Sequence, residues 1–163
     1  MTDSAMDTVG RTTSLRIGEI AAVADDTELK TLLGSCLGLA LYDCRGRIGG
    51  LAHIMLPDSR GQDAPVGKFV DTAVPELICR IEQFGGKRHN IRAKLAGGAN
   101  MFSTNSTTTI GEQNLAAIEI ELSARSIPIV ATHCGGTQGR RMTLRPATGV
   151  VVIEVVGSQT IEI

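Results

Sequence analysis

One cysteine and one histidine are the residues of this chain best suited to chemistry. Cys36 ends the segment TLLGSC, and His53 ends the segment GGLAH. A thiol attacks as thiolate, and a nearby imidazole can accept its proton and later return it to a leaving group. The pair therefore predicts attack on a carbonyl carbon, a thioester intermediate and hydrolysis of that thioester.

Between Cys36 and His53 lie two strand-like runs, residues 37–42 and 47–52, which form one hairpin joined by the turn sequence DCRG (43–46). An Asp at the first position and a Gly at the last are favoured in short turns. If Asp43 pairs with Gly46, Cys36 lies directly opposite His53, and such opposed residues have Cβ atoms about 4.5–5.5 Å apart. A bulge at Gly46 would change this register by one residue. We therefore predict that the thiol and the imidazole lie close together.

The residues around the cysteine also suit a site. Gly34 and Ser35 are small and would let a substrate approach the backbone closely. A third group usually fixes the orientation of such an imidazole, and Thr31, on the strand that leads to the cysteine, is the nearest candidate. The structural alternative is that Cys36 is a small buried hydrophobe and His53 a core histidine. The pattern alone leaves both interpretations open.

Composition narrows the class of protein. The chain has 163 residues, 42% of them hydrophobic, and a formal net charge of −1, as expected of one soluble domain with a sizeable core. It lacks the basic excess of a nucleic-acid-binding protein, and the aromatic content of 2% argues against base stacking. No apolar run approaches the ~20 residues that a membrane span needs, so no membrane insertion is expected.

The N-terminal residues 1–13 are polar and lack the apolar core of a signal peptide. We expect them to form a disordered tail, and we expect the protein to be cytoplasmic. The four cysteines show no CxxC spacing, so free thiols are expected in a reducing compartment.

Periodicity predicts one α+β domain over residues 14–163. Apolar residues recur with helical spacing over 70–84 and over 111–125. Strand-type runs occupy 15–24, 29–33, 37–42, 47–52, 91–96, 127–132, 142–145 and 150–156. We expect a layered sandwich of mixed or antiparallel β-sheet with two main helices packed on it.

A glycine turn follows one of these strands. Gly97 and Gly98 end the strand, and Met101 and Phe102 come soon after. These four residues are expected to form a substrate or partner surface, with a simple turn carrying core residues as the alternative.

The adjacent pair His133 and Cys134 raises the question of a metal. Neighbouring residues of a strand point to opposite faces, and no typical zinc spacing occurs in the chain. Neither a metal nor another cofactor is therefore expected.

Several segments resemble the CheD family of chemoreceptor glutamine deamidases. They are TLLGSCLGLALYD (31–43), GGLAHIMLPDS (49–59), GKFVDTAV (67–74), KLAGGANMF (94–102), IGEQN (110–114) and GG (135–136). The resemblance implies hydrolysis of glutamine side-chain amides to glutamate on the cytoplasmic helices of methyl-accepting chemotaxis receptors, a protein-glutamine glutaminase activity. It also implies a Cys-His-Thr triad, with Cys36 as nucleophile, His53 as base and acid, and Thr31 as the orienting residue.

The threonine departs from the pattern of some family members, which carry it six residues before the cysteine. Lys30 stands at that position here, and Thr31 is five before. An offset of one residue reverses the face of a strand, unless a bulge absorbs it. Thr31 acting through its backbone carbonyl, or another group orienting His53, are the alternatives.

The resemblance further implies a partner, a CheC-type phosphatase. Two functions follow: a cofactor-free cysteine amidohydrolase, and a non-catalytic binding module that regulates such a phosphatase. A thiol opposite an imidazole favours the enzyme, since a pure regulator does not need it. A transglutaminase outcome is open to the same thioester, although an open, wet site would favour hydrolysis.

Overall fold

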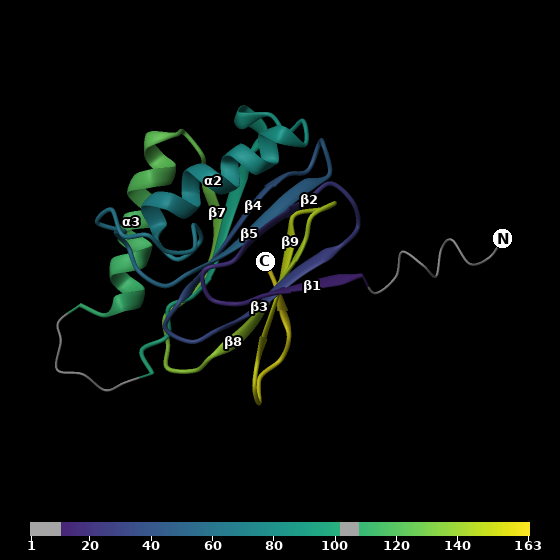
Figure 1. Ribbon diagram of the computed structural model, residues 1–163. Helices are drawn as coiled ribbons and strands as arrows, with labels where there is room; N and C mark the ends of the chain where they lie inside the picture. The colour runs from purple at the N-terminus through teal and green to yellow at the C-terminus, as the bar shows by residue number, and fades with distance from the viewer. Residues whose placement is uncertain (1–10, 102–107) are drawn as a thin grey trace.

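The computed structural model describes residues 11–101 and 108–163, which form three layers (Figure 1). The elements in chain order are β1 (Thr12–Leu15), β2 (Ile20–Val23), β3 (Glu28–Leu33), β4 (Leu37–Asp43), β5 (Ile48–Ile54), α2 (Val70–Gln83), a 3₁₀ turn (Arg88–Asn90), β6 (Arg92–Gly97), α3 (Ile110–Ala124), β7 (Ile129–Cys134), β8 (Arg140–Arg145), β9 (Val150–Val155) and β10 (Ile161–Glu162). The predicted α+β sandwich with two main helices is confirmed.

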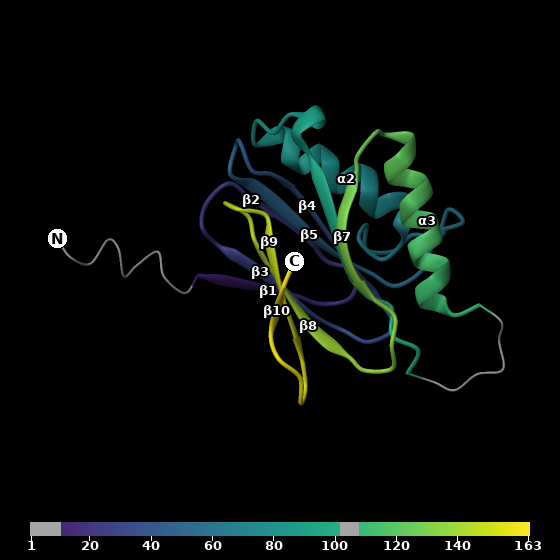
Figure 2. The same cartoon turned by 180° about the vertical axis from the view of Figure 1, so that it is seen from behind.

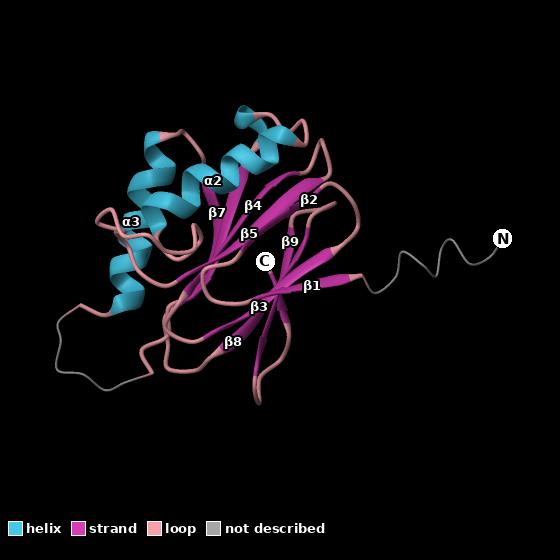
Figure 3. Cartoon of the chain, viewed as in Figure 1, coloured by secondary structure: helices cyan, strands magenta, loops and turns pink. Residues whose placement is uncertain are grey.

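The ten strands of the described residues make two mixed sheets. The inner sheet has the order β2-β5-β4-β6-β7, and the outer sheet has the order β1-β3-β8-β9-β10. The pairs β1–β3 and β6–β7 are parallel, and the other neighbours are antiparallel. Both helices cover the face of the inner sheet that points away from the outer sheet (Figures 2 and 3).

Two cores follow from this order of layers. The strands β4 and β5 are buried along their whole length, because helices cover one of their faces and the outer sheet covers the other. The strand β3 shows the alternation of a sheet with one solvent-facing side: Leu29, Thr31 and Leu33 are buried, and Leu32 is exposed. In the described part of the chain no helix is long and apolar enough to cross a membrane.

The loop of the β4–β5 hairpin is longer than predicted. Asp43 pairs with Ile48, so residues 44–47 form the connection. The Asp43 carboxylate accepts hydrogen bonds from the backbone N–H groups of Arg45 and Gly46, at 3.0 and 3.1 Å. An Asp that hydrogen-bonds its own turn stabilises this wider loop as well as a two-residue one, so the residue types alone did not fix the length.

The longer loop changes the pairing of the two candidate residues. Gly38 is the partner of His53 in the ladder, so the prediction that Cys36 lies directly opposite His53 is wrong. The shift amounts to two residues, which preserves the face to which each side chain points. Cys36 directly precedes the first residue of this ladder, two positions from Gly38, and is therefore not directly opposite His53.

Smaller differences concern the ends of elements. The strand β1 begins at Thr12, inside the segment expected to be a tail, and residues 1–10 lie outside the described part. The helix α3 begins with a capping box, in which Thr109 and Glu112 each accept a hydrogen bond from the other's backbone N–H. The short strand β10 was not predicted.

The packing of α3 on the inner sheet gives a matched test of the fold. Ile118 and Ile120 lie two residues apart on α3, with 0% and 70% of their surfaces exposed. Ile118→Ala should lower the free energy of unfolding by about 2–5 kcal/mol, because it leaves a cavity in the core. Ile120→Ala should change it by less than about 0.5 kcal/mol. Urea denaturation measures both, and equal effects would contradict this position of α3.

Candidate active site

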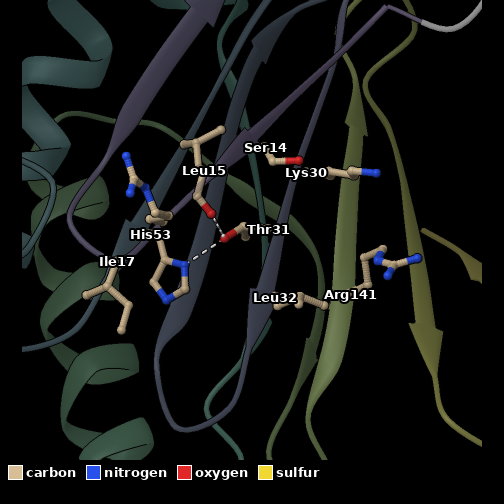
Figure 4. Close-up of a pocket in the computed structure, with 9 residues that line it drawn as sticks. Ser14, Leu15, Ile17, Lys30, Thr31, Leu32, His53 and Arg141 are labelled. Carbon is tan, nitrogen blue, oxygen red and sulfur yellow. Dashed lines mark hydrogen bonds between the residues drawn. The ribbon is translucent and has the colours of Figure 1, made fainter.

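A hydrogen bond between Thr31 and His53 joins the two sheets. Thr31 lies on β3 of the outer sheet and His53 on β5 of the inner sheet, and 2.6 Å separates the hydroxyl oxygen from Nδ1 (Figure 4). Both residues are buried, with 3% and 4% of their surfaces exposed. Of the two positions considered, Thr31 and Lys30, it is thus Thr31 whose side chain points between the sheets.

A third group determines which of the two side chains donates in this hydrogen bond. The Thr31 hydroxyl also lies 2.8 Å from the backbone carbonyl of Leu15 on β1. The hydroxyl has one proton, and a carbonyl can only accept, so Thr31 donates to Leu15. Its oxygen must then accept from Nδ1–H of His53. In the neutral imidazole this leaves Nε2 unprotonated, with a free lone pair.

The backbone around His53 is fixed as well. The amide of Gly18 donates to the carbonyl of His53 at 2.9 Å, and the amide of His53 donates to the carbonyl of Glu19 at 3.1 Å. Two residues further on, the carbonyl of Met55 accepts from the buried side chain of Asn114 on α3 at 3.0 Å. The orientation of the imidazole is therefore held through both its ring and its main chain.

Cys36 lies on a loop that the predicted glycine turn contacts closely. The carbonyls of Cys36 and Gly34 accept hydrogen bonds from the amides of Gly98 and Ala99, at 2.9 and 3.0 Å. A Cβ atom on Gly97 would lie 2.4 Å from the Cys36 carbonyl, and φ of Gly97 is 103°. Glycine is required there for both reasons, and the structure brings Gly34, Gly97 and Gly98 together with Cys36.

The side chain of Cys36 is half-buried and packs against the core between the two sheets, the same space into which His53 points. Cys36 lies in a loop and is not paired with His53 in the ladder, so a rotation of the side chains and a bound substrate would have to bring the thiol and the imidazole together. Burial raises the pKa of the Cys36 thiol. Burial also lowers the pKa of His53, so both groups are neutral near pH 7.

One hollow opens beside His53 and a second beside the cysteine loop, and Cys36 itself lines neither of the two. The first, of about 730 Å³, is lined by His53 and Thr31, and the second, of about 770 Å³, by Gly34 and Met101. Leu32 lines both hollows, as does Arg141. The remaining predicted surface residues are Ser35, which is half-buried in the cysteine loop, and Phe102, which lies outside the described residues.

His133 and Cys134 each make contacts other than the metal binding considered above. Arg140, a donor only, lies 2.9 Å from Nδ1 of His133, so this ring nitrogen accepts. Cys134 packs against the core on the helix side of the inner sheet. Over residues 11–101 and 108–163, no three His, Cys, Asp or Glu side chains are grouped closely enough to hold a metal ion.

Two groups that hold the site, the carbonyl of Leu15 and the amide of Gly18, were not predicted from the sequence. Both are backbone groups: every residue type supplies the carbonyl, and every type except proline supplies the amide N–H. The parallel pairing of Leu15 with Thr31 brings together residues 16 positions apart, which no local pattern in the sequence indicates.

Comparison with known proteins now decides the family. Residues 55–155 match the family model described as CheD chemotactic sensory transduction. The probable chemoreceptor glutamine deamidase CheD of Methanococcus maripaludis strain C5 is 41% identical over 141 residues, which cover 85% of this chain and 92% of that protein. The chain belongs to the CheD family. A further CheD relative, the chemoreceptor glutamine deamidase of Halalkalibacterium halodurans, is 42% identical over 130 residues, covering 76% and 80% of the two chains.

A solved structure of Neisseria meningitidis protein NMB0706, of the DUF152 family, aligns with a TM-score of 0.47 at 11% identity, covering 83% of this chain and 67% of that one.

The lowered pKa of His53 predicts how stability depends on pH. An unfolded histidine titrates near pH 6.5, and burial lowers this pKa in the folded protein. Between the unfolded and the folded pKa, His53 binds more protons in the unfolded state than in the folded one. The contribution of the neutral His53 to folding stability is therefore present above about pH 6.5 and is lost as the pH falls through the folded pKa. Urea denaturation of the wild type and of His53→Gln should therefore show the wild type losing more stability between pH 7.5 and 5. Equal losses in the two proteins would contradict this.

Proposed function

We propose that this chain deamidates glutamine side chains of chemoreceptors to glutamate, on the receptors' cytoplasmic helices. Relatives that are named for this activity and are 41% and 42% identical support the choice of substrate. The observation that carries the chemistry is the hydrogen bond from His53 Nδ1–H to Thr31, because it leaves Nε2 free to act as a base. Cys36 is the nucleophile and Thr31 the orienting residue of this proposal.

Acylation forms a thioester and releases ammonia. Sγ of Cys36 attacks the side-chain amide carbon of the glutamine while Nε2 of His53 takes the thiol proton. The tetrahedral intermediate then collapses, and the His53 imidazolium gives that proton to the departing nitrogen. The C–N bond breaks and ammonia leaves.

Deacylation regenerates the enzyme. Nε2 of His53 takes a proton from water, and the hydroxyl oxygen attacks the thioester carbon. The C–S bond breaks, the Cys36 thiolate takes the proton back from the imidazolium, and the product is a glutamic acid side chain that becomes glutamate by releasing its proton to solvent. No oxidant, metal or cofactor enters the balance of either step.

The burial of both groups supports a base mechanism over a resting ion pair. Burial raises the pKa of the Cys36 thiol, so little thiolate is present at neutral pH without a base. Burial lowers the pKa of His53, so its imidazole is neutral and able to accept at the same pH. A positioned histidine of this kind contributes roughly 10²–10⁴-fold to the rate.

A CheC-type phosphatase remains a proposed partner, supported by the family to which the chain belongs. A binding module that regulates such a phosphatase without catalysis is the alternative function. That alternative requires neither the neutral imidazole nor the thiol, so variants at these positions separate the two.

Mass spectrometry of a cognate receptor's cytoplasmic fragment is the direct test. We expect wild-type protein to convert specific glutamines to glutamate, and Cys36→Ala to convert none. His53→Gln should lower the rate at least about 100-fold, because it removes the base. Cys79→Ala is the matched control, since Cys79 is an exposed thiol on α2 and should leave conversion unchanged.

Conversion by Cys36→Ala at the wild-type rate would contradict the assigned nucleophile. No conversion by any of the proteins, on a receptor confirmed as cognate, would favour the regulatory module.

A further inference from the structure

Two large aliphatic side chains stand exposed in the groove that contains His53. Ile17 is 54% exposed and Leu32 is 66% exposed, and both line the hollow that His53 and Thr31 also line. In Figure 4 the imidazole lies between them. A single exposed leucine is common on protein surfaces, whereas two such side chains on the walls of one groove indicate a ligand with apolar groups.

The path of the chain explains why the groove opens here. The ladder between β1 and β3 ends with the pair Leu15 and Thr31. The chain then leaves the outer sheet, crosses over residues 16–19 and enters the inner sheet as β2. The strand β3 continues past that point, so Leu32, on the solvent-facing side, lies at an edge that β1 no longer covers, and the crossing segment lines the other side of the hollow.

Both walls are fixed relative to the proposed catalytic residues. Ile17 directly precedes Gly18, whose amide donates to the carbonyl of His53 at 2.9 Å. Leu32 directly follows Thr31, whose hydroxyl holds the imidazole. The spacing between the two aliphatic side chains and Nε2 is therefore set by the same contacts that orient the base.

Two of the three arginine and lysine side chains that line the hollow are ion-paired. Arg16 forms an ion pair with Glu19 at 3.5 Å, and Arg141 forms one with Glu154 at 3.4 Å. Lys30 and Arg141 lie on the side of Leu32 away from the imidazole (Figure 4). Contacts between apolar groups should therefore dominate the recognition of a segment lying in the groove.

We propose that Ile17 and Leu32 select the substrate glutamine by binding apolar side chains that flank it in the receptor segment. The inference rests on the proposed function and adds to it the chemistry by which one glutamine is chosen among many. A glutamine with apolar neighbours on both sides can place its amide at His53 while those neighbours cover the two aliphatic walls. A glutamine among charged residues would leave those charges desolvated against Ile17 and Leu32, and is excluded.

Binding measured without turnover tests this selection. In the Cys36→Ala background, the dissociation constant for a labelled receptor fragment can be measured by fluorescence anisotropy. Leu32→Gln and Ile17→Gln should each weaken binding about tenfold, and Leu32→Met should retain it. The affinity should also change little between about 0.1 and 0.5 M salt, because apolar contacts are not screened.

Ile120→Gln is the matched control. Ile120 is an aliphatic residue of similar exposure, 70%, and it lies on α3, beyond the inner sheet. This variant should bind like the Cys36→Ala parent. All four replacements are at exposed positions, and an unchanged melting temperature shows that each variant is folded.

Unchanged affinity in both Leu32→Gln and Ile17→Gln would overturn the proposal, as would binding that is lost on adding salt. These failures are separate from a failure of the proposed function, which appears as an absence of deamidation by the protein with Cys36 intact.

Discussion

The site depends on one buried hydrogen bond that connects the two sheets. Thr31 accepts from His53 because its own proton goes to the carbonyl of Leu15, so the register of β1 on β3 determines which imidazole nitrogen is protonated. Losing the acceptor would leave a buried N–H unpaired, at a cost of about 1–3 kcal/mol. Sheet packing, strand register and the protonation state of the proposed base are consequently parts of one arrangement.

Glycines allow the sheets and loops to approach closely enough for this arrangement. A Cβ atom on Gly38, the ladder partner of His53, would lie 2.4 Å from Sδ of Met142 in the opposite sheet. A Cβ atom on Gly97 would lie equally close to the carbonyl of Cys36. The first glycine lets Met142 of the outer sheet pack over β4, the neighbour of the histidine strand, and the second lets β6 support the cysteine loop. A side chain at Gly97 would push the cysteine loop away from β6, whereas one at Gly38 would require the Met142 side chain to move.

Local patterns predicted the elements of the fold well and the contacts between them less well. Helical spacing located α2 and α3 within about two residues, because each buries one apolar face. The predicted pairing of Cys36 with His53 was wrong, because Asp43 supports a four-residue loop as readily as a shorter turn. The offset of Thr31 left its direction open, and its burial and its hydrogen bonds with Leu15 and His53 show that it points inward.

The protonation state of His53 tests the central claim most directly. With ¹⁵N-labelled histidine at a pH above the pKa of His53, NMR should show the proton on Nδ1 and a bare Nε2 in the wild type. Thr31→Val should shift the tautomer away from this form, Thr31→Ser should preserve it, and Lys30→Ala should leave it unchanged. A proton on Nε2 in the wild type, or a tautomer that Thr31→Val does not alter, would contradict the account.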